Sequence, residues 1–223
     1  MMRGGLAPTH DLLRLREPIA LTVDAPVPSW VDAALRSIPW VVVRRGYVRD
    51  GMVPVGVRGT KRQERFAAFL AVAEIAERLS PEYLAGSPAI VAQQRKDAVP
   101  ALSALARVAP ILERRGYGWG PGGSVGFELA TGVRTATSSS DLDVILRQDR
   151  RLEPNAAAHL RDALAEAAAP ARIDVLLETP RGGVSLADLA TRPAQVLVRT
   201  PDGPRLAADP WRVDADTPLE RGS

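Results

Sequence analysis

The sequence contains no cysteine, so disulfide bonds, cysteine-based zinc sites and thiol nucleophiles are excluded. Its only histidines are His10 and His159, which excludes a metal site built mainly from histidine. Aromatic residues make up 4% of the chain, and no basic stripe is interleaved with them, so the pattern typical of a nucleic-acid-binding surface is missing. No apolar run approaches the roughly 20 residues that a transmembrane helix needs. We therefore expect neither a nucleic-acid nor a membrane partner.

The charge of the chain is small but unevenly distributed. Residues 1–115 carry 17 Lys or Arg and 11 Asp or Glu, a net of +6, whereas residues 116–223 carry 12 and 15, a net of −3. The basic half suits an acidic partner or a phosphorylated ligand. The first residues, MMRGGLAPTHDLLRLREP, lack the apolar segment of a secretory signal, so a cytoplasmic location is the default expectation.

The first half of the chain is predicted to be a β-rich module followed by a helix. The β-branched run Val41–Val43 predicts a strand. Asp50-Gly51 is a strong hairpin signal, and it is followed by a second strand, MVPVGVRG. Over residues 60–79 apolar side chains recur at helical spacing after a capping-box pattern, which predicts a helix there.

The polar, proline-marked stretch over residues 81–98 is the expected boundary between two modules. A helix is predicted over residues 99–115, kinked or split at Pro110 and ended by Gly116. Strands and helices then alternate, which predicts an α+β fold of mixed α/β character. The expected strands are YGWGPGGS (or a turn), DLDVIL, ARIDVLLET and QVLVRT, and the expected helices are VGFELATG and NAAAHLRDALAEAAA, the latter capped by Asn155. The domain boundaries follow as 1–95, 96–213 and a flexible tail over 214–223.

Two carboxylates, Asp141 and Asp143, stand one residue apart at the start of the apolar run DLDVIL. On a strand both side chains point to the same face, where like charges repel and raise each other's pKa. Asp174 lies in a second apolar strand, ARIDVLLET, and its burial is costly unless something pairs with it. Plainer interpretations exist, because Asp pairs at strand ends are mostly solvated, and Asp174 could lie on an exposed face or pair with Arg172.

The triplet Gly122-Gly123-Ser124 precedes a short predicted helix. Glycines let the backbone approach an anion, and free N–H groups at a helix start bind phosphate oxygens, although such a triplet is more often a simple turn. Gly123 and Ser124 are therefore candidates for phosphate binding. With three carboxylates on neighbouring strands they form a constellation that could hold two Mg²⁺ ions, which clamp the attacking and leaving oxygens of a displacement at phosphorus.

The order of a GS dipeptide, an h-D-h-D-h strand and a later h-D-h strand (h, apolar) resembles the DNA-polymerase-β-like nucleotidyltransferases over residues 116–180. This resemblance implies a nucleotidyltransferase-like mixed sheet with flanking helices. The chain departs from the superfamily in the somewhat long gap between Ser124 and Asp141, where the loop TATSSS accommodates the excess.

A narrower resemblance extends from His10 to Trp211. The segments THDLLRL, VVVRRG, VPVGVRGTKRQERFA, GGSVGFELATG, SDLDVIL, IDVLLETPRGGVSLADLA, VLVRTPDGPRL and DPW resemble the phosphoribosyl-dephospho-CoA transferases of malonate decarboxylase, also called malonate decarboxylase holo-acyl-carrier-protein synthases. The resemblance implies Mg²⁺-dependent transfer of the prosthetic group from 2′-(5″-triphosphoribosyl)-3′-dephospho-CoA to a serine of the acyl carrier protein, with release of diphosphate. It implies Asp141 and Asp143 as the catalytic metal-binding pair, and the superfamily adds Asp174. The N-terminal module would then bind the substrate or the carrier protein.

The basic segment VGVRGTKRQER places Lys61, Arg62 and Arg65 in the first turns of the predicted helix, with Arg58 just before it. Positive charge at a helix start opposes the macrodipole, and a bound anion would offset that cost, since arginine matches phosphate bidentately. We therefore predict that Arg58, Lys61 and Arg62 bind substrate phosphates. The alternative is a solvated helix face with Glu64 as the partner.

Two other functions fit the same carboxylates. The chain could be a nucleotidyltransferase that uses an NTP and another hydroxyl acceptor, or a non-catalytic nucleotide-binding module of the same fold. The second is usually marked by loss of the acids, and all three are present. Among other residues, Trp119 and Phe127 are expected in the core and Glu128 on a helix surface.

Overall fold

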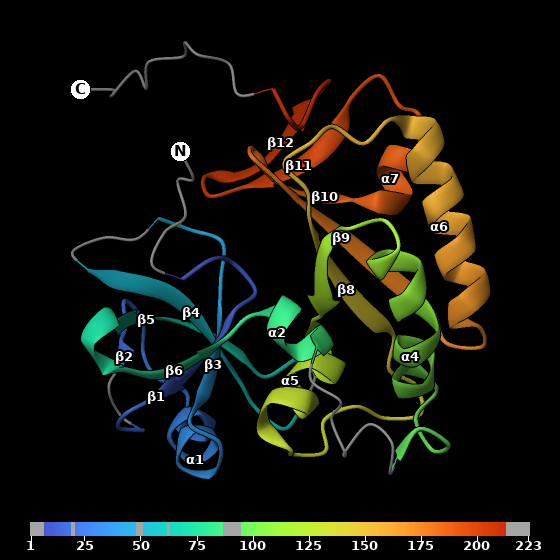
Figure 1. The fold of residues 1–223 in the computed structure, drawn as a ribbon. Helices are drawn as coiled ribbons and strands as arrows, with labels where there is room; N and C mark the ends of the chain where they lie inside the picture. Colours follow the sequence, from blue (N-terminus) through green and yellow to red (C-terminus); the bar gives the residue numbers. More distant parts are fainter. Residues whose placement is uncertain (1–6, 19–20, 48–50, 62, 87–94, 213–223) are drawn as a thin grey trace, which may run out of the picture.

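Two six-stranded sheets, one in each half of the chain, build the molecule (Figure 1). The computed structural model describes residues 7–18, 21–47, 51–61, 63–86 and 95–212. The first sheet has the strand order β2-β5-β4-β3-β1-β6 and the second the order β12-β11-β10-β9-β8-β7. Helices and a mixed sheet together confirm the predicted α+β class. The tail predicted over residues 214–223 lies outside the described residues.

The first sheet is antiparallel throughout. Its buried side chains are mostly Val and Leu, and they pack with Val31 and Leu35 of helix α1. The antiparallel pairing of β3 with β4 confirms the predicted hairpin, while Asp50 of its predicted turn lies outside the described residues. The elements of this half are β1 (Leu12–Leu15), β2 (Leu21–Thr22), α1 (Ser29–Ser37), β3 (Trp40–Val43), β4 (Met52–Arg58), β5 (Arg65–Ala71), a 3₁₀ turn (Val72–Glu74) and β6 (Ile75–Leu79).

The helix predicted over residues 60–79 is wrong, because β5 and β6 occupy this segment. β5 pairs with β4 from Met52 opposite Ala71 to Arg58 opposite Arg65, and this pairing overrides the helical spacing of its apolar residues. The capping pattern has another use. The Glu64 carboxylate accepts hydrogen bonds from the Lys61 backbone N–H at 2.9 Å and the Thr60 hydroxyl at 3.2 Å, which closes the turn between the two strands. Helix α1 was not predicted.

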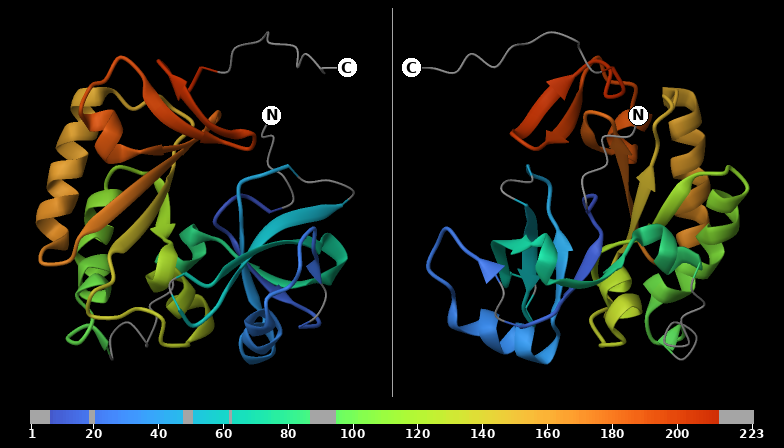
Figure 2. Two further views of the ribbon diagram at one scale, coloured as in Figure 1. Left: turned by 180° about the vertical axis from the view of Figure 1, so that it is seen from behind. Right: turned by 60° about the vertical axis from the view of Figure 1, so that its left-hand side comes forward.

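The second sheet pairs β8 with β9 in parallel, and all its other neighbours are antiparallel. Helices α4, α6 and α7 cover one of its faces, and the first half of the molecule lies on the other (Figures 1 and 2). The strands are β7 (Gly118–Pro121), β8 (Leu142–Arg147), β9 (Ile173–Thr179), β10 (Gly182–Ser185), β11 (Val196–Thr200) and β12 (Gly203–Ala207). The helices are α2 (Pro81–Gly86), α4 (Pro100–Glu113), α5 (Gly123–Thr131), α6 (Pro154–Ala168) and α7 (Leu186–Ala190).

Most elements predicted for the second half are confirmed. Helix α4 continues through Pro110 without being split, and Gly116 follows it with a left-handed φ of 66°. Asn155 lies inside the first turn of α6 rather than capping it, since the N-cap residue is Glu153. Trp119 and Phe127 are buried as expected. None of the described helices is long and apolar enough to cross a membrane.

Candidate active site

Parallel pairing of β8 and β9 brings the predicted carboxylates to one end of the second sheet. Asp143 stands directly opposite Asp174 in the register, and cross-strand neighbours point to the same face of a sheet. Asp141 immediately precedes β8 and is held there by the bond from the Leu142 N–H to the Arg172 carbonyl oxygen, 2.8 Å long. The sheet therefore gathers the three acids that the sequence places far apart.

Arg172 lies between two of these acids. Its Nη2 donates to Asp141 Oδ2 at 2.5 Å and to Asp174 Oδ2 at 3.4 Å. The pairing of Asp174 with Arg172, which the sequence left open, is therefore present. The Arg172 side chain is 68% exposed, and the described part of the chain gives its guanidinium no further partner. Among the described residues, no three His, Cys, Asp or Glu side chains are arranged as a metal-binding group.

Asp143 is the least solvated of the three acids. Burial raises its pKa, and the negative charges of Asp174 and Asp141 raise it further, while Arg58 and Arg65 oppose the shift. The pKa of Asp143 stays above the ordinary value for aspartate, because the nearby arginines do not fully offset burial and the two neighbouring negative charges. A group of three carboxylates with excess negative charge is a donor set that fits a hard divalent cation such as Mg²⁺. The side chain of Arg172, which binds two of these acids, would have to leave.

The glycine turn packs directly on Asp143. The Gly122 N–H donates to the Asp143 carbonyl oxygen at 2.9 Å, and Gly123 has a φ of 55°. A Cβ atom at Gly123 would lie 2.7 Å from the Asp143 Cγ and would collide with its Oδ2. Only glycine therefore fits between the start of α5 and the carboxylate. Ser124 follows as the second residue of α5, and its side chain does not line the adjacent cavity.

That cavity, of about 930 Å³, lies between the two halves of the molecule. Arg58 at the end of β4 and Arg65 at the start of β5 line it beside Gly122 and Gly123. These two arginines are a cross-strand pair, and like charges in that position destabilise a sheet. Burial and Arg65 lower the pKa of Arg58, while Asp143 opposes the shift. The cavity thus has a basic wall, and its glycine turn packs on the Asp143 carboxylate.

Only some of the residues predicted to bind phosphate lie at the cavity. Arg58 and Gly123 lie at the cavity, but Lys61 does not line it; its side chain is 69% exposed and stands 4.0 Å from Glu64. The helix that would have aligned Lys61 with Arg58 does not exist. Arg62 lies outside the described residues.

Three further arginines of the cavity were missed, namely Arg44, Arg45 and Arg199. The Arg44-Arg45 pair after the VVV strand could have indicated a basic cavity wall, since arginines directly after a buried strand lie at the edge of its sheet. Arg199 had no such signal, because a single arginine in an alternating strand is ordinary.

A buried polar cluster closes the far side of the cavity. His10 Nε2 lies 2.9 Å from Glu178 Oε1, and Arg45 Nη2 donates to the same oxygen. Burial would raise the pKa of Glu178, but the bonds from His10 and Arg45 outweigh it and hold the pKa below its ordinary value. His10 is therefore hydrogen-bonded across the two halves.

Arg147 of β8 ties the halves together beneath the cavity. Its guanidinium donates to the Thr9 carbonyl oxygen at 3.0 Å, to the fully buried Asp11 carboxylate at 2.7 Å and to Glu82 at 2.8 Å. Arg78 also donates to Asp11. The walls of the cavity are thus fixed relative to each other by buried charge-assisted hydrogen bonds, which are stronger than neutral ones.

Glu128 is fully buried, so its predicted place on a helix surface is wrong. Arg95 pairs with it, and the backbone N–H groups of Thr135 and Ala136 donate to it at 2.9 and 2.8 Å. Burial would raise its pKa, but Arg95 and these N–H groups outweigh burial, so the pKa lies below its ordinary value. Glu128 thereby anchors the loop that leads from α5 to Asp141.

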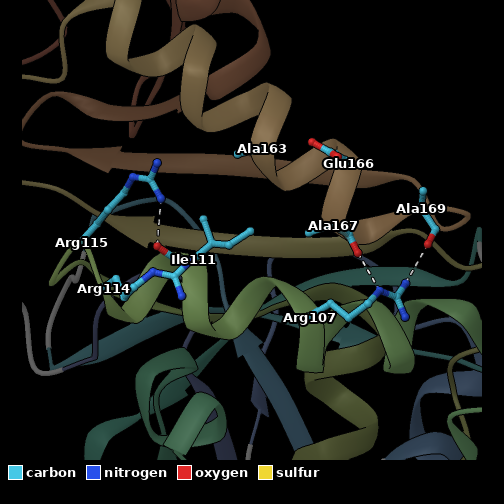
Figure 3. A pocket seen from close by; sticks show the side chains of 8 residues that line it. All are labelled: Arg107, Ile111, Arg114, Arg115, Ala163, Glu166, Ala167 and Ala169. Atoms are coloured by element: carbon cyan, nitrogen blue, oxygen red, sulfur yellow. Dashed lines mark hydrogen bonds between the residues drawn. The ribbon is translucent and has the colours of Figure 1, made fainter.

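A second hollow, of about 630 Å³, lies between α4 and α6 on the helical face of the sheet (Figure 3). Its most prominent polar group, Arg107, donates to the Ala167 and Ala169 carbonyl oxygens at 2.7 and 2.8 Å. The guanidinium therefore satisfies the last carbonyl groups of α6. This hollow is separated from the carboxylates by the sheet.

Comparison with known proteins identifies relatives along nearly the whole chain. A family model described as the N-terminal domain of phosphoribosyl-dephospho-CoA transferase MdcG matches residues 8–81, and one described as its C-terminal domain matches residues 89–210.

Several curated proteins named phosphoribosyl-dephospho-CoA transferase are similar to this chain. That of Pseudomonas putida strain W619 is 43% identical over 204 residues, which covers 92% of this chain and 95% of the relative. That of Azotobacter vinelandii is 42% identical over 207 residues, with coverages of 91% and 93%. That of Pseudomonas aeruginosa is 39% identical over 212 residues, with coverages of 95% and 96%. No solved structure matches significantly.

Proposed function

Since the chain belongs to the family of phosphoribosyl-dephospho-CoA transferases, we propose that its acceptor is a serine of the malonate decarboxylase acyl carrier protein. The donor is 2′-(5″-triphosphoribosyl)-3′-dephospho-CoA, the leaving group is diphosphate and the cofactor is Mg²⁺. The observation that supports this is the partly buried Asp143, with Asp141 and Asp174 beside it, next to an arginine-lined cavity large enough for a nucleotide.

In this reaction the serine hydroxyl oxygen attacks the α-phosphorus of the donor. A bond forms between that oxygen and phosphorus, the bond from phosphorus to the bridging oxygen breaks, and diphosphate departs with the electron pair. Asp141, Asp143 and Asp174 would hold Mg²⁺, which supplies charge stabilisation to the phosphate oxygens. The hydroxyl proton would pass to the carboxylate of Asp174, the most exposed of the three acids.

The backbone at the start of α5 and the two arginines of the β4–β5 hairpin would hold the departing phosphates. Arg58 and Arg65 face Asp143 closely enough to affect its pKa, and a phosphate placed between them would relieve their mutual repulsion. Positioning and charge stabilisation account for most of the catalysis of such transfers. Both halves of the molecule line the cavity, so we propose that they bind the donor jointly.

Arg172 has a defined part in this proposal. It neutralises Asp141 and Asp174 in the absence of a cation and swings into solvent when one binds. Exposed ion pairs contribute only about 0–1 kcal/mol, so their loss is a small cost beside the coordination of a divalent ion by carboxylates.

Mass spectrometry of apo carrier protein incubated with the enzyme, the triphosphate donor and Mg²⁺ tests the proposal. We expect the carrier to gain the mass of one phosphoribosyl-dephospho-CoA group, and chelation of the metal to stop the gain. Asp141→Asn and Asp143→Asn should abolish transfer with unchanged thermal unfolding, whereas Asp162→Asn on the exposed face of α6 should act like wild type. Residual transfer above about a tenth of wild type in either site variant would contradict the assigned roles.

A parallel incubation with labelled ATP separates the proposal from the two alternatives. Labelling by ATP, with no transfer from the triphosphate donor, would identify an NTP-dependent nucleotidyltransferase. The absence of both transfer and divalent-ion binding would identify a non-catalytic module.

A further inference from the structure

The cavity has a second end, about 13 Å from the carboxylates. Glu178 follows Asp174 by four residues on β9, and a strand rises about 3.3 Å per residue. Leu176, midway between them on the same face, lines the cavity. Gly183 of β10 pairs with both Glu178 and Arg199, so these residues form a row across the sheet. The cavity therefore extends from the glycine turn that packs on Asp143 to Arg199 of this row.

Two arginines line the cavity from opposite walls. Arg44 directly follows β3 of the first sheet, and Arg199 belongs to β11 of the second. Within the described ranges neither guanidinium has an ion-pair partner, in contrast to Arg45, which is paired with Glu178. The stem of Arg44 packs over Gly56, where its Cδ lies 3.3 Å from the position of a Cβ atom. Two cations without counter-charges in one cavity are suited to a doubly charged anion.

The surroundings of these arginines are apolar and made by the β11–β12 hairpin. Leu197 and Pro204 line the cavity beside Arg199, and Leu197 is 43% exposed. In the register, Arg199 stands opposite Pro204. The second end thus offers an anion site next to an uncovered apolar wall, which suits a ligand that carries phosphate beside an apolar or weakly polar arm.

We propose that Arg44 and Arg199 bind the diphosphate bridge of the dephospho-CoA half of the donor, with the pantetheine arm against the β11–β12 hairpin. This inference rests on the proposed function and adds the orientation of the donor. Two linked ribose units separate the triphosphate from the diphosphate bridge, so one anion site cannot hold both. The triphosphate lies at the carboxylates with Arg58 and Arg65, and the diphosphate lies at the row of Arg199.

Calorimetric titration without divalent ions tests this orientation with two probes, dephospho-CoA and inorganic triphosphate. The double variant Arg44→Gln/Arg199→Gln removes the charges but keeps part of each side-chain stem. We expect its Kd for dephospho-CoA to rise at least tenfold while its Kd for triphosphate changes less than twofold. The double variant Arg58→Gln/Arg65→Gln should show the reverse. Arg205→Gln is the matched control, because Arg205 stands opposite Val198 on the other face of the same hairpin.

Kinetics provides the second readout: the Arg44→Gln/Arg199→Gln variant should raise KM for the donor at least tenfold and leave KM for the carrier protein unchanged. An unchanged Kd for dephospho-CoA in this variant, or a loss equal to that of Arg205→Gln, overturns the inference. Weakened triphosphate binding with unaltered dephospho-CoA binding overturns it as well, since the donor would then lie in the reverse direction. A wild-type enzyme that transfers no group at all contradicts the proposed function instead.

Discussion

Replacing Gly123 by alanine is the sharpest test of how the glycine turn positions the Asp143 carboxylate, to which we assign a catalytic role. The new Cβ would stand 2.7 Å from the Asp143 Cγ, where ordinary contact begins at 3.4 Å. The carboxylate carbon must therefore move by about 0.7 Å, and the nearer oxygen farther. Gly123 also has a left-handed φ of 55°, which costs an L-residue roughly 1–2 kcal/mol.

The consequence for catalysis follows from the displacement of Asp143. A misplacement of about 1 Å in an active site can reduce the rate on the order of 10²-fold. We expect Gly123→Ala to lower the rate of prosthetic-group transfer by about that factor. The rate is measured by the mass gain of the apo carrier protein under saturating donor.

Gly132→Ala is the matched control for backbone strain. Gly132 follows α5 with a φ of 72°, and a Cβ there would meet no atom within 4 Å. Both variants therefore carry a similar left-handed penalty and a similar fall in thermal stability, but only Gly123→Ala presses on Asp143. Transfer by Gly123→Ala within threefold of that by Gly132→Ala would refute the idea that this turn sets the position of the carboxylate.

Three other predictions concern the supporting charges. Arg147→Ala should lose about 1–3 kcal/mol of unfolding free energy in urea, because it removes one of the two arginines that bind the buried Asp11 carboxylate. The more exposed Arg151→Ala should lose less than about 1 kcal/mol; equal losses would be inconsistent with a buried role for Arg147. The pKa of Glu128 lies below its ordinary value of 4.5, so its contribution to stability is complete above pH 4.5 and is lost as the pH falls through the lower folded value. Glu128→Gln should therefore be less stable at pH 7 and less sensitive to acid below pH 4.5, and parallel urea curves for both proteins would speak against this. Arg172→Gln should bind Mg²⁺ about 2- to 30-fold more tightly at low salt, because it removes two exposed pairs of roughly 0.2–1 kcal/mol each, while Arg161→Gln should not; weaker binding would contradict a competing role for Arg172.

The local sequence pattern predicted an element correctly where the alternation or helical spacing of its own residues was unambiguous. The strand β8 alternates buried apolar residues with Asp143 and Arg147, and that period of two is visible in DLDVIL. The same holds for β9 and β11. Helix α4 likewise shows its apolar stripe directly, and Pro110 does not interrupt it.

Secondary structure and burial were predicted wrongly where two local structures were acceptable and contacts with a distant segment made one of them more favourable. Residues 65–71 combine helical spacing with an alternating pattern, and only the presence of β4 beside them makes the strand more favourable. Glu128 is acceptable on a helix surface, and its burial is possible only because Arg95 and the amides of Thr135 and Ala136 converge on it. Neither outcome is encoded within the element itself.

The sequence alone was enough to single out the candidate site residues, since Asp141, Asp143, Asp174 and the turn at Gly123 are recognisable by type, spacing and order. Tertiary structure decided what faces them. The register of two parallel strands sets Asp174 opposite Asp143, and the packing of one half on the other makes Arg58, Arg65, Arg44 and Arg199 walls of one cavity. The physical reason is that side-chain alternation is a property of a few consecutive residues, whereas the neighbours across a cavity depend on contacts between segments more than a hundred residues apart.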